Sequence, residues 1–184
     1  YLSRVQKLMP LCLTSLSGGS KDNAIPRSCQ ATVVAMGIGI ERINGIAAAL
    51  QQEIREKYDE PDALVQAFDV DALGGNSLTT AATADVISLL CAAPNGVQSY
   101  SADIPGLVQT SLNLGVCHLG DQFAATFSVR SSVNREKEEL LQQLRDLTAF
   151  YKGTYSQAGT YPAWEYRKDS PLRDTMVRVY QQMF

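Results

Sequence analysis

The feature that most constrains the fold is a regular alternation of apolar and polar residues over residues 107–133. One set of alternate positions is mostly apolar and comprises Val108, Thr110, Leu112, Leu114 and Val116. The positions between them include Gln109, Ser111 and Asn113. A period of two is typical of a β-strand with one buried face, so a strand is predicted here.

A second strand follows a tight turn at residues 118–121. Its predicted core positions are Phe123, Ala125, Phe127 and Val129, so the opposite face carries Gln122, Thr126, Ser128 and Arg130. A hairpin with one apolar face and one polar face turns the polar face to water or to a ligand. Arg130 ends the polar row, and the alternation alone leaves open whether this face meets water or a ligand.

The overall composition is that of an ordinary soluble protein. The chain has 184 residues, 45% of them hydrophobic and 19% charged, which suits one domain or one domain of two similar halves. The net charge of −3 disfavours a nucleic-acid partner, which calls for a clustered basic surface. No apolar run is long enough to span a membrane and no signal segment begins the chain, so a cytoplasmic location is expected.

Two stretches of the chain show the same predicted order of strand, strand, helix and strand. The first consists of strands over 11–16 and 24–36, an amphipathic helix over 40–58 and a strand over 63–73. The second consists of the hairpin, a helix over 134–152 capped by Asn134, and a strand-like or irregular aromatic stretch over 154–168. The order predicts an α+β fold of two layers, an antiparallel-rich sheet with helices on one face.

Three further helices complete the prediction. One ends before Pro10, and one spans about 79–93 with Ser77 or Thr79 as its cap. The last begins at residues 169–171, with Ser170 as cap and Pro171 in its first turn. The chain opens on Tyr1 and closes within an amphipathic pattern, so we expect a piece of a longer protein.

Cysteine and histidine offer little chemistry on their own. The four cysteines occur singly, which favours buried free thiols over disulfides or metal ligands. The single histidine, His118, is placed in the hairpin turn, where a solvated role is expected.

Four segments taken together resemble the aminoacyl-histidine dipeptidases, the bacterial carnosinase-type zinc peptidases that are also called X-His dipeptidases. These segments are GGSKDNAIPR at 18–27, TSLNLG at 110–115, SVRSS at 128–132, and YPAWE at 161–165 followed by DSPL at 169–172. The resemblance runs in order over essentially the whole chain. It is more specific than any one segment alone.

The resemblance implies a place within a larger enzyme. In this family a catalytic domain with two zinc ions is interrupted by a ferredoxin-like lid domain that also supplies the dimer interface. Residues 1–184 would be that single lid and dimerisation domain, with 169–184 leading back to the catalytic domain of the same chain. The family's metal ligands have no counterpart here, and one histidine cannot build the usual two-metal site. The piece alone is therefore expected to be inactive and to bind no metal.

The resemblance also suggests roles for two residues. Arg130 matches an arginine that grips the C-terminal carboxylate of the substrate, and Asn23 matches an asparagine that binds near the substrate carbonyl or carboxylate. The alternatives are a solvated arginine at a strand end and an asparagine that only satisfies a turn. The family's lid histidine belongs to a Gly-Gly-His-Ser segment expected before Tyr1, so His118 is not its counterpart.

Two functions follow as hypotheses. The first is a lid that closes over the site of a zinc dipeptidase cleaving Xaa-His and similar dipeptides, and that dimerises through edge strands or helices. In this view Trp164 is a candidate for an interdomain contact, whereas its alternative is ordinary packing. The second is a self-standing α+β module that binds a small molecule or a protein on its polar sheet face.

Overall fold

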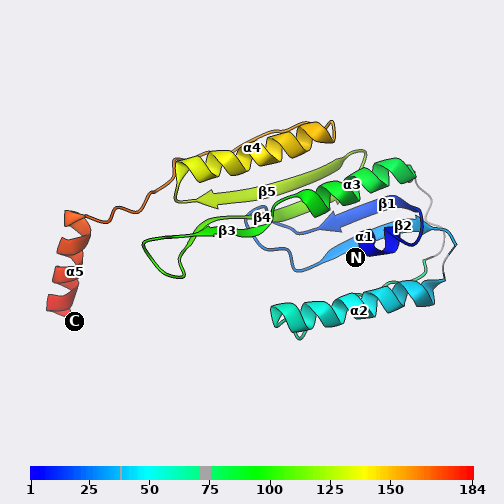
Figure 1. Ribbon diagram of the computed structural model, residues 1–184, viewed down its shortest axis with the longest axis horizontal. Coiled ribbons are helices and arrows are strands. Elements are labelled where there is room, and N and C mark those ends of the chain that lie inside the picture. Colours follow the sequence, from blue (N-terminus) through cyan, green and yellow to red (C-terminus); the bar gives the residue numbers. More distant parts are fainter. Residues whose placement is uncertain (38, 71–75) are drawn as a thin grey trace.

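A five-stranded antiparallel sheet organises the molecule (Figure 1). The computed structural model describes residues 1–37, 39–70 and 76–184. The strands are β1 (Leu11–Gly18), β2 (Cys29–Ala35), β3 (Gly96–Tyr100), β4 (Val108–Leu119) and β5 (Phe123–Ser131). β2 pairs with β1, and β4 pairs with β1, β3 and β5. β5 runs along one whole edge of β4. The other edge of β4 is shared by two strands, with β1 at one end and β3 at the opposite end.

The helices form the second layer. They are α1 (Leu2–Gln6), α2 (Ile40–Tyr58), α3 (Thr80–Ala92), α4 (Asn134–Phe150) and α5 (Pro171–Met183). Figure 1 shows α5 apart from the sheet and the other helices, at the end of an extended segment. The predicted α+β fold, an antiparallel sheet with helices, is confirmed.

The core lies between one face of the sheet and helices α1 to α4. The first cluster joins Leu13 and Leu16 of β1 and Leu119 of β4 to Val86 of α3. The second joins Leu11 to α1, with Ile43 and Ile46 of α2 packed against it. The third joins Leu112 of β4 to Leu140 and Leu144 of α4. Strand register puts all the strand residues of these clusters on one face, so the other face is left open.

A carboxylate ties α4 to the sheet. Glu136 accepts hydrogen bonds from the Ser99 hydroxyl of β3 at 2.6 Å, the Gln109 amide of β4 at 2.5 Å, and the Thr110 hydroxyl. The bonds from Ser99 and then Thr110 lower the pKa of Glu136 below its usual value. β3 itself was not expected from the sequence.

The strand expected over 63–73 was wrong where the structure describes it. Residues 63–68 alternate in burial, but residues 63–70 join no sheet. Their backbone amides bond to helix side chains instead: Val65 donates to the Gln51 side chain at 2.9 Å, and Ala67 to the Asn44 side chain at 3.1 Å. Residues 71–73 of this prediction lie outside the described residues.

The segment 154–168 packs along α4 much as residues 63–70 pack along α2. It was predicted to be strand-like or irregular, and it is irregular. Ala163 donates its amide to the Asn134 side chain at 3.0 Å, and the Lys137 ammonium donates to the Tyr161 carbonyl. Asn134 therefore does not cap α4, which begins after Val133 without a side-chain cap; that prediction was wrong. In both halves a helix binds the returning segment through its side chains.

The caps of two other helices agree with the predictions from the sequence. Thr79 accepts a hydrogen bond from the Ala82 amide at 3.1 Å at the start of α3, which decides between Thr79 and Ser77. Ser170 caps α5 through the Arg173 amide, with Pro171 in the first turn.

All four cysteines are free thiols, but only Cys117 is buried, since Cys12 is half-buried and Cys29 and Cys91 are exposed. Burial raises the pKa of Cys117 to about 11, so this thiol stays protonated at neutral pH. The expectation of free thiols is correct, while the expectation that they are buried holds for Cys117 alone.

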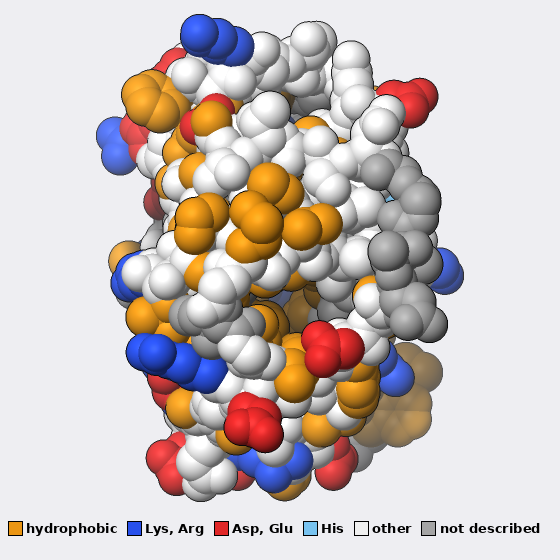
Figure 2. Space-filling model, turned by 90° about the vertical axis from the view of Figure 1, so that its right-hand side faces the viewer, with side chains coloured by type: hydrophobic (Ala, Val, Ile, Leu, Met, Phe, Trp, Pro, Cys, Tyr) orange, Lys and Arg blue, Asp and Glu red, His pale blue; other side chains and the backbone are white. Residues whose placement is uncertain are grey.

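Large apolar side chains remain exposed over much of the molecule. They include Leu64, Phe68, Val70, Trp164, and on α5 Leu172, Met176, Tyr180 and Met183. Figure 2 shows one end of the molecule, where apolar side chains gather near the middle and charged ones lie mostly toward the edge. Among the described residues no helix is long and apolar enough to cross a membrane.

Candidate functional site

Arg130 lies on the open face of the sheet. It pairs with Ser111 of β4, while the neighbouring pair Leu112 and Val129 points into the core. Its side chain is exposed, and within residues 1–37, 39–70 and 76–184 its guanidinium has no hydrogen bond or ion pair. The structure therefore leaves all of its donors available to a ligand.

A β-bulge divides the face on which Arg130 lies. The register of β4 against β5 shifts between Leu114 and Val116, so Gly115 is an extra residue in β4. Beyond it Val116 pairs with Thr126 on the open face, and Cys117 and Leu119 enter the core. The prediction that Val116 faces the core was wrong, because the bulge reverses the alternation.

The loop between β1 and β2 crosses the open face at this bulge. A Cβ atom added to Gly115 would lie 2.1 Å from the Asp22 carbonyl oxygen, and one added to Gly19 would lie 1.8 Å from the Gly115 oxygen. Gly19 also has a φ of +74°, which favours glycine. Two glycines thus let the two backbones touch.

Asn113 binds the same loop from the sheet. Its side-chain amide donates to the Asp22 carbonyl at 3.3 Å and to the Ala24 carbonyl at 3.0 Å, the residues on either side of Asn23. The turn itself is closed by backbone, with the Ala24 amide donating to the Lys21 carbonyl at 3.4 Å. The Asn23 side chain is exposed and makes no hydrogen bond within the part of the chain that is described.

The open face therefore carries two groups suited to a carboxylate or a carbonyl. A guanidinium holds a carboxylate through two parallel hydrogen bonds, and an amide donates one bond and accepts another. Lys21 and Arg27 of the crossing loop are exposed and add positive charge. Sequence reasoning missed Asn113, Gly19 and Gly115 as parts of this arrangement, although an isolated glycine within a strand pattern is a known signal of a bulge.

His118 lies at the far end of the face. It belongs to β4, where it pairs with Ser17 and Ala124, and the turn follows at residues 120–122, so its placement in the turn was wrong. The described residues contain no group of three or more His, Cys, Asp or Glu side chains that fits a metal ion. The donor set on this face does not suit zinc.

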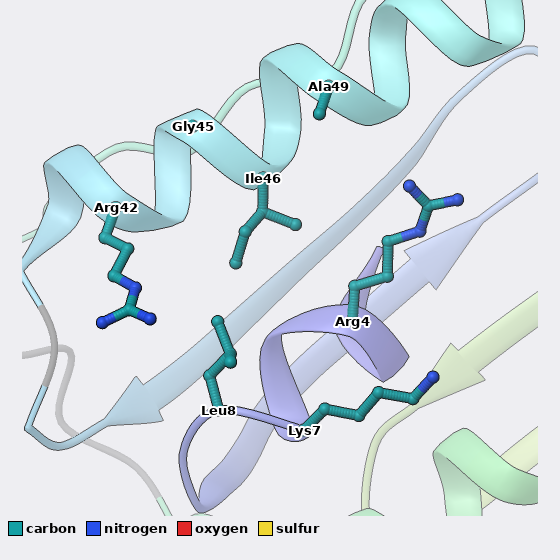
Figure 3. A pocket seen from close by; sticks show the side chains of 7 residues that line it. All are labelled: Arg4, Lys7, Leu8, Arg42, Gly45, Ile46 and Ala49. Carbon is teal, nitrogen blue, oxygen red and sulfur yellow. The ribbon is translucent and has the colours of Figure 1, made fainter.

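A hollow lies elsewhere, between α1 and α2 (Figure 3). It has a volume of 540 Å³ and is lined by Leu8, Ile46 and Ala49, with Arg4, Lys7 and Arg42 around it. Arg4 is already paired with Glu53 at 2.6 Å. None of the residues predicted from the sequence lines this hollow.

The aromatic residues near the end of the chain do not form a cage. Tyr155 packs on the cluster of Leu112, while Trp164 is 91% exposed. Cations from α4 and α5 lie over three of the rings: Arg145 over Tyr155, Lys137 over Tyr161 and Arg173 over Tyr166.

The chain is similar to known dipeptidases. It is 28% identical over 186 residues to the cytosol non-specific dipeptidase of Escherichia coli, across 100% of this chain. The crystal structure of the aminoacylhistidine dipeptidase of Vibrio alginolyticus superimposes with a TM-score of 0.82 and 25% identity, across 97% of this chain. The chain is homologous to these dipeptidases. No protein-family model matches it.

The match covers only a part of each dipeptidase's own length. The chain spans 38% of the Escherichia coli dipeptidase and 37% of the Vibrio alginolyticus dipeptidase chain. The resemblance to aminoacyl-histidine dipeptidases noted in the sequence is confirmed, and the chain aligns with a part of each dipeptidase. The roles of Arg130 and Asn23 stay predictions.

Proposed function

We propose that the chain is the lid and dimerisation domain of a cytoplasmic dipeptidase that hydrolyses Xaa-His and related dipeptides. The observation that carries the proposal is the exposed guanidinium of Arg130, which has no partner among the described residues and lies on the same sheet face as the loop of Asn23. Homology across the whole chain to part of two dipeptidases supports it over a self-standing binding module.

Arg130 would bind the C-terminal carboxylate of the substrate. Its planar fork matches the two carboxylate oxygens, and no protein carboxylate in the described chain competes for it. The Asn23 amide would bind a neighbouring carbonyl or carboxylate oxygen. Together the two groups would fix the C-terminal end of the dipeptide, which orients its peptide bond toward groups supplied by another domain.

The lid would act by closing over the substrate. Closure excludes water and brings the carboxylate-binding residues to the reacting end of the molecule, so that opening and closing limit turnover. In the parent enzyme two zinc ions would supply Lewis-acid chemistry. Their ligands would lie in the catalytic domain of the same chain, since the described residues of this piece offer no suitable ligand group.

Exposed apolar surface supports contact with further protein. On α5, Leu172, Met176, Tyr180 and Met183 recur at helical spacing and α5 has no buried residue. We assign this stripe, together with exposed Trp164, to contact with the catalytic domain. Dimerisation would use either the free edge of β2 or helix packing.

The experiment is substitution of Arg130 in the full-length enzyme. Arg130→Ala should raise the KM for a dipeptide by roughly a hundredfold, because a charge-assisted hydrogen-bonding pair is lost. Arg130→Lys should recover part of that loss, since a lysine keeps the charge without the fork. Unchanged KM and turnover in Arg130→Ala would refute the carboxylate role.

A further inference from the structure

The crossing loop is attached to the sheet at two places, and Asn23 lies beside both. The first is the backbone contact of Gly19 and Asp22 with Gly115, which has no room for a Cβ atom. The second is the pair of hydrogen bonds from Asn113 to the carbonyls of Asp22 and Ala24. The nitrogen of one side-chain amide carries two N–H groups, so Asn113 can serve both carbonyls at once.

These bonds determine where Asn23 can lie. Its two flanking carbonyls are held by the sheet, whereas its own side chain is exposed. Without them the described loop would keep its backbone hydrogen bonds, from Ala24 to Lys21 at 3.4 Å and from Gly19 to Ser28 at 3.3 Å, and its contacts at the glycines. Asn113 therefore limits the motion of the one segment that carries Asn23.

The same attachment places the loop of Asn23 on the face of the sheet that carries Arg130. Asn113 pairs with Ser128, and Arg130 is the next residue of β5 on the same face. Diagonal neighbours on one face of an antiparallel pair lie about 7–8 Å apart, which is within reach of a long side chain. The loop segment bound by Asn113 and the side chain of Arg130 thus lie on the same face of the sheet.

We propose that Asn113 is a positioning residue that fixes Asn23 on the face of the sheet that carries Arg130, so that the two side chains bind one substrate as a unit. The proposal rests on the function proposed above for Asn23 and Arg130. Asn113 acts through the loop and does not itself touch substrate. Its loss would leave both binding residues present but would let Asn23 move relative to Arg130, and small misplacements weaken binding strongly.

The test is a double-mutant cycle in the full-length enzyme, with the KM and kcat for a dipeptide as readouts. Asn23→Ala and Asn113→Ala should each raise KM by roughly tenfold, and the double variant should be no worse than Asn23→Ala alone. Asn113→Asp keeps the shape of the side chain but sets a carboxylate against two carbonyls, and it should reproduce the loss. The matched control is Ser128→Ala, which removes the cross-strand partner of Asn113 and should leave KM unchanged.

The outcomes separate this inference from the function on which it rests. If Asn23→Ala raises KM but Asn113→Ala and Asn113→Asp do not, or if their effects add in full to that of Asn23→Ala, the positioning role is wrong and the proposed function stands. If Asn23→Ala has no effect, the role of Asn23 in the proposed function is wrong, and the positioning role with it. A KM effect that vanishes in the Asn23→Ala background supports the proposal, because a general loss of stability would persist there.

Discussion

Glu136 and Arg130 are charged residues on neighbouring elements, but they differ in their hydrogen-bond partners and therefore in their roles. Three side chains from β3 and β4 donate hydrogen bonds to the Glu136 carboxylate, so its charge is satisfied inside the protein. The Arg130 guanidinium is exposed and has no such partner in the described ranges. A satisfied charge stabilises the fold, whereas a free one is available to a ligand.

The pKa of Glu136 leads to a prediction on stability. Because hydrogen bonds from Ser99 and Thr110 lower that pKa below 4.5 in the folded protein, its contribution is present above pH 4.5 and is lost as the pH falls through the lowered value. Glu136→Gln should reduce the free energy of unfolding by about 1–2 kcal/mol at pH 7. Urea unfolding at pH 7 and below pH 4 measures it.

The matched control for this prediction is Glu138→Gln, an exposed glutamate of the same helix for which no bond to the sheet is seen. Its free energy of unfolding should stay within about 0.5 kcal/mol of the parent value at both pH values. A Glu136→Gln deficit that does not shrink on acidification would contradict the assignment.

At the scale of elements, predictions that depend on local pattern succeeded. The helix over 40–58 was predicted at its observed bounds because its apolar stripe is local, and it ends at Asp59, which adopts a left-handed conformation with φ 53°. Ser170 and Pro171 likewise marked the start of α5. In both cases the spacing of residues within the element was sufficient to predict it.

Predictions that depend on distant partners failed. Residues 63–70 have the alternation of a strand, but side chains of α2 supply their hydrogen-bond acceptors, which no local pattern reveals. The side of the sheet taken by Val116 depends on a bulge at Gly115, where the loop from β1 to β2 crosses. The polar face and Arg130 were predicted from the sequence, whereas the approach of Asn23 through Asn113 was not.

The cap of α3 gives a prediction at this scale. Thr79→Ala removes the acceptor for the Ala82 amide and should lower the free energy of unfolding by about 1 kcal/mol. Ser77→Ala is the matched control. Among the described residues the Ser77 hydroxyl bonds only to the Thr14 hydroxyl, at 3.0 Å, so its loss should change stability by less than about 0.5 kcal/mol. Thermal unfolding of both variants compares them, and equal losses would argue against Thr79 as the cap.

For the whole molecule, the balance of surfaces matches a part of a larger protein. One sheet face is covered by four helices, the other presents polar side chains and a crossing loop, and α5 presents an apolar stripe without a buried residue. The chain also spans less than two fifths of the dipeptidases to which it is homologous. The proposed lid, which would bind the substrate carboxylate and rest on a catalytic domain, would account for all three surfaces.

The central claim is that Arg130 recognises the substrate carboxylate, and substrate discrimination tests it most directly. The measurement is kcat/KM of the full-length enzyme for a dipeptide and for the same dipeptide with an amidated C-terminus, in the parent and in Arg130→Ala. We predict that the parent prefers the free carboxylate by roughly a hundredfold and that Arg130→Ala loses most of this preference, because the variant no longer distinguishes a charged from a neutral end. A preference of equal size in both proteins would contradict the account.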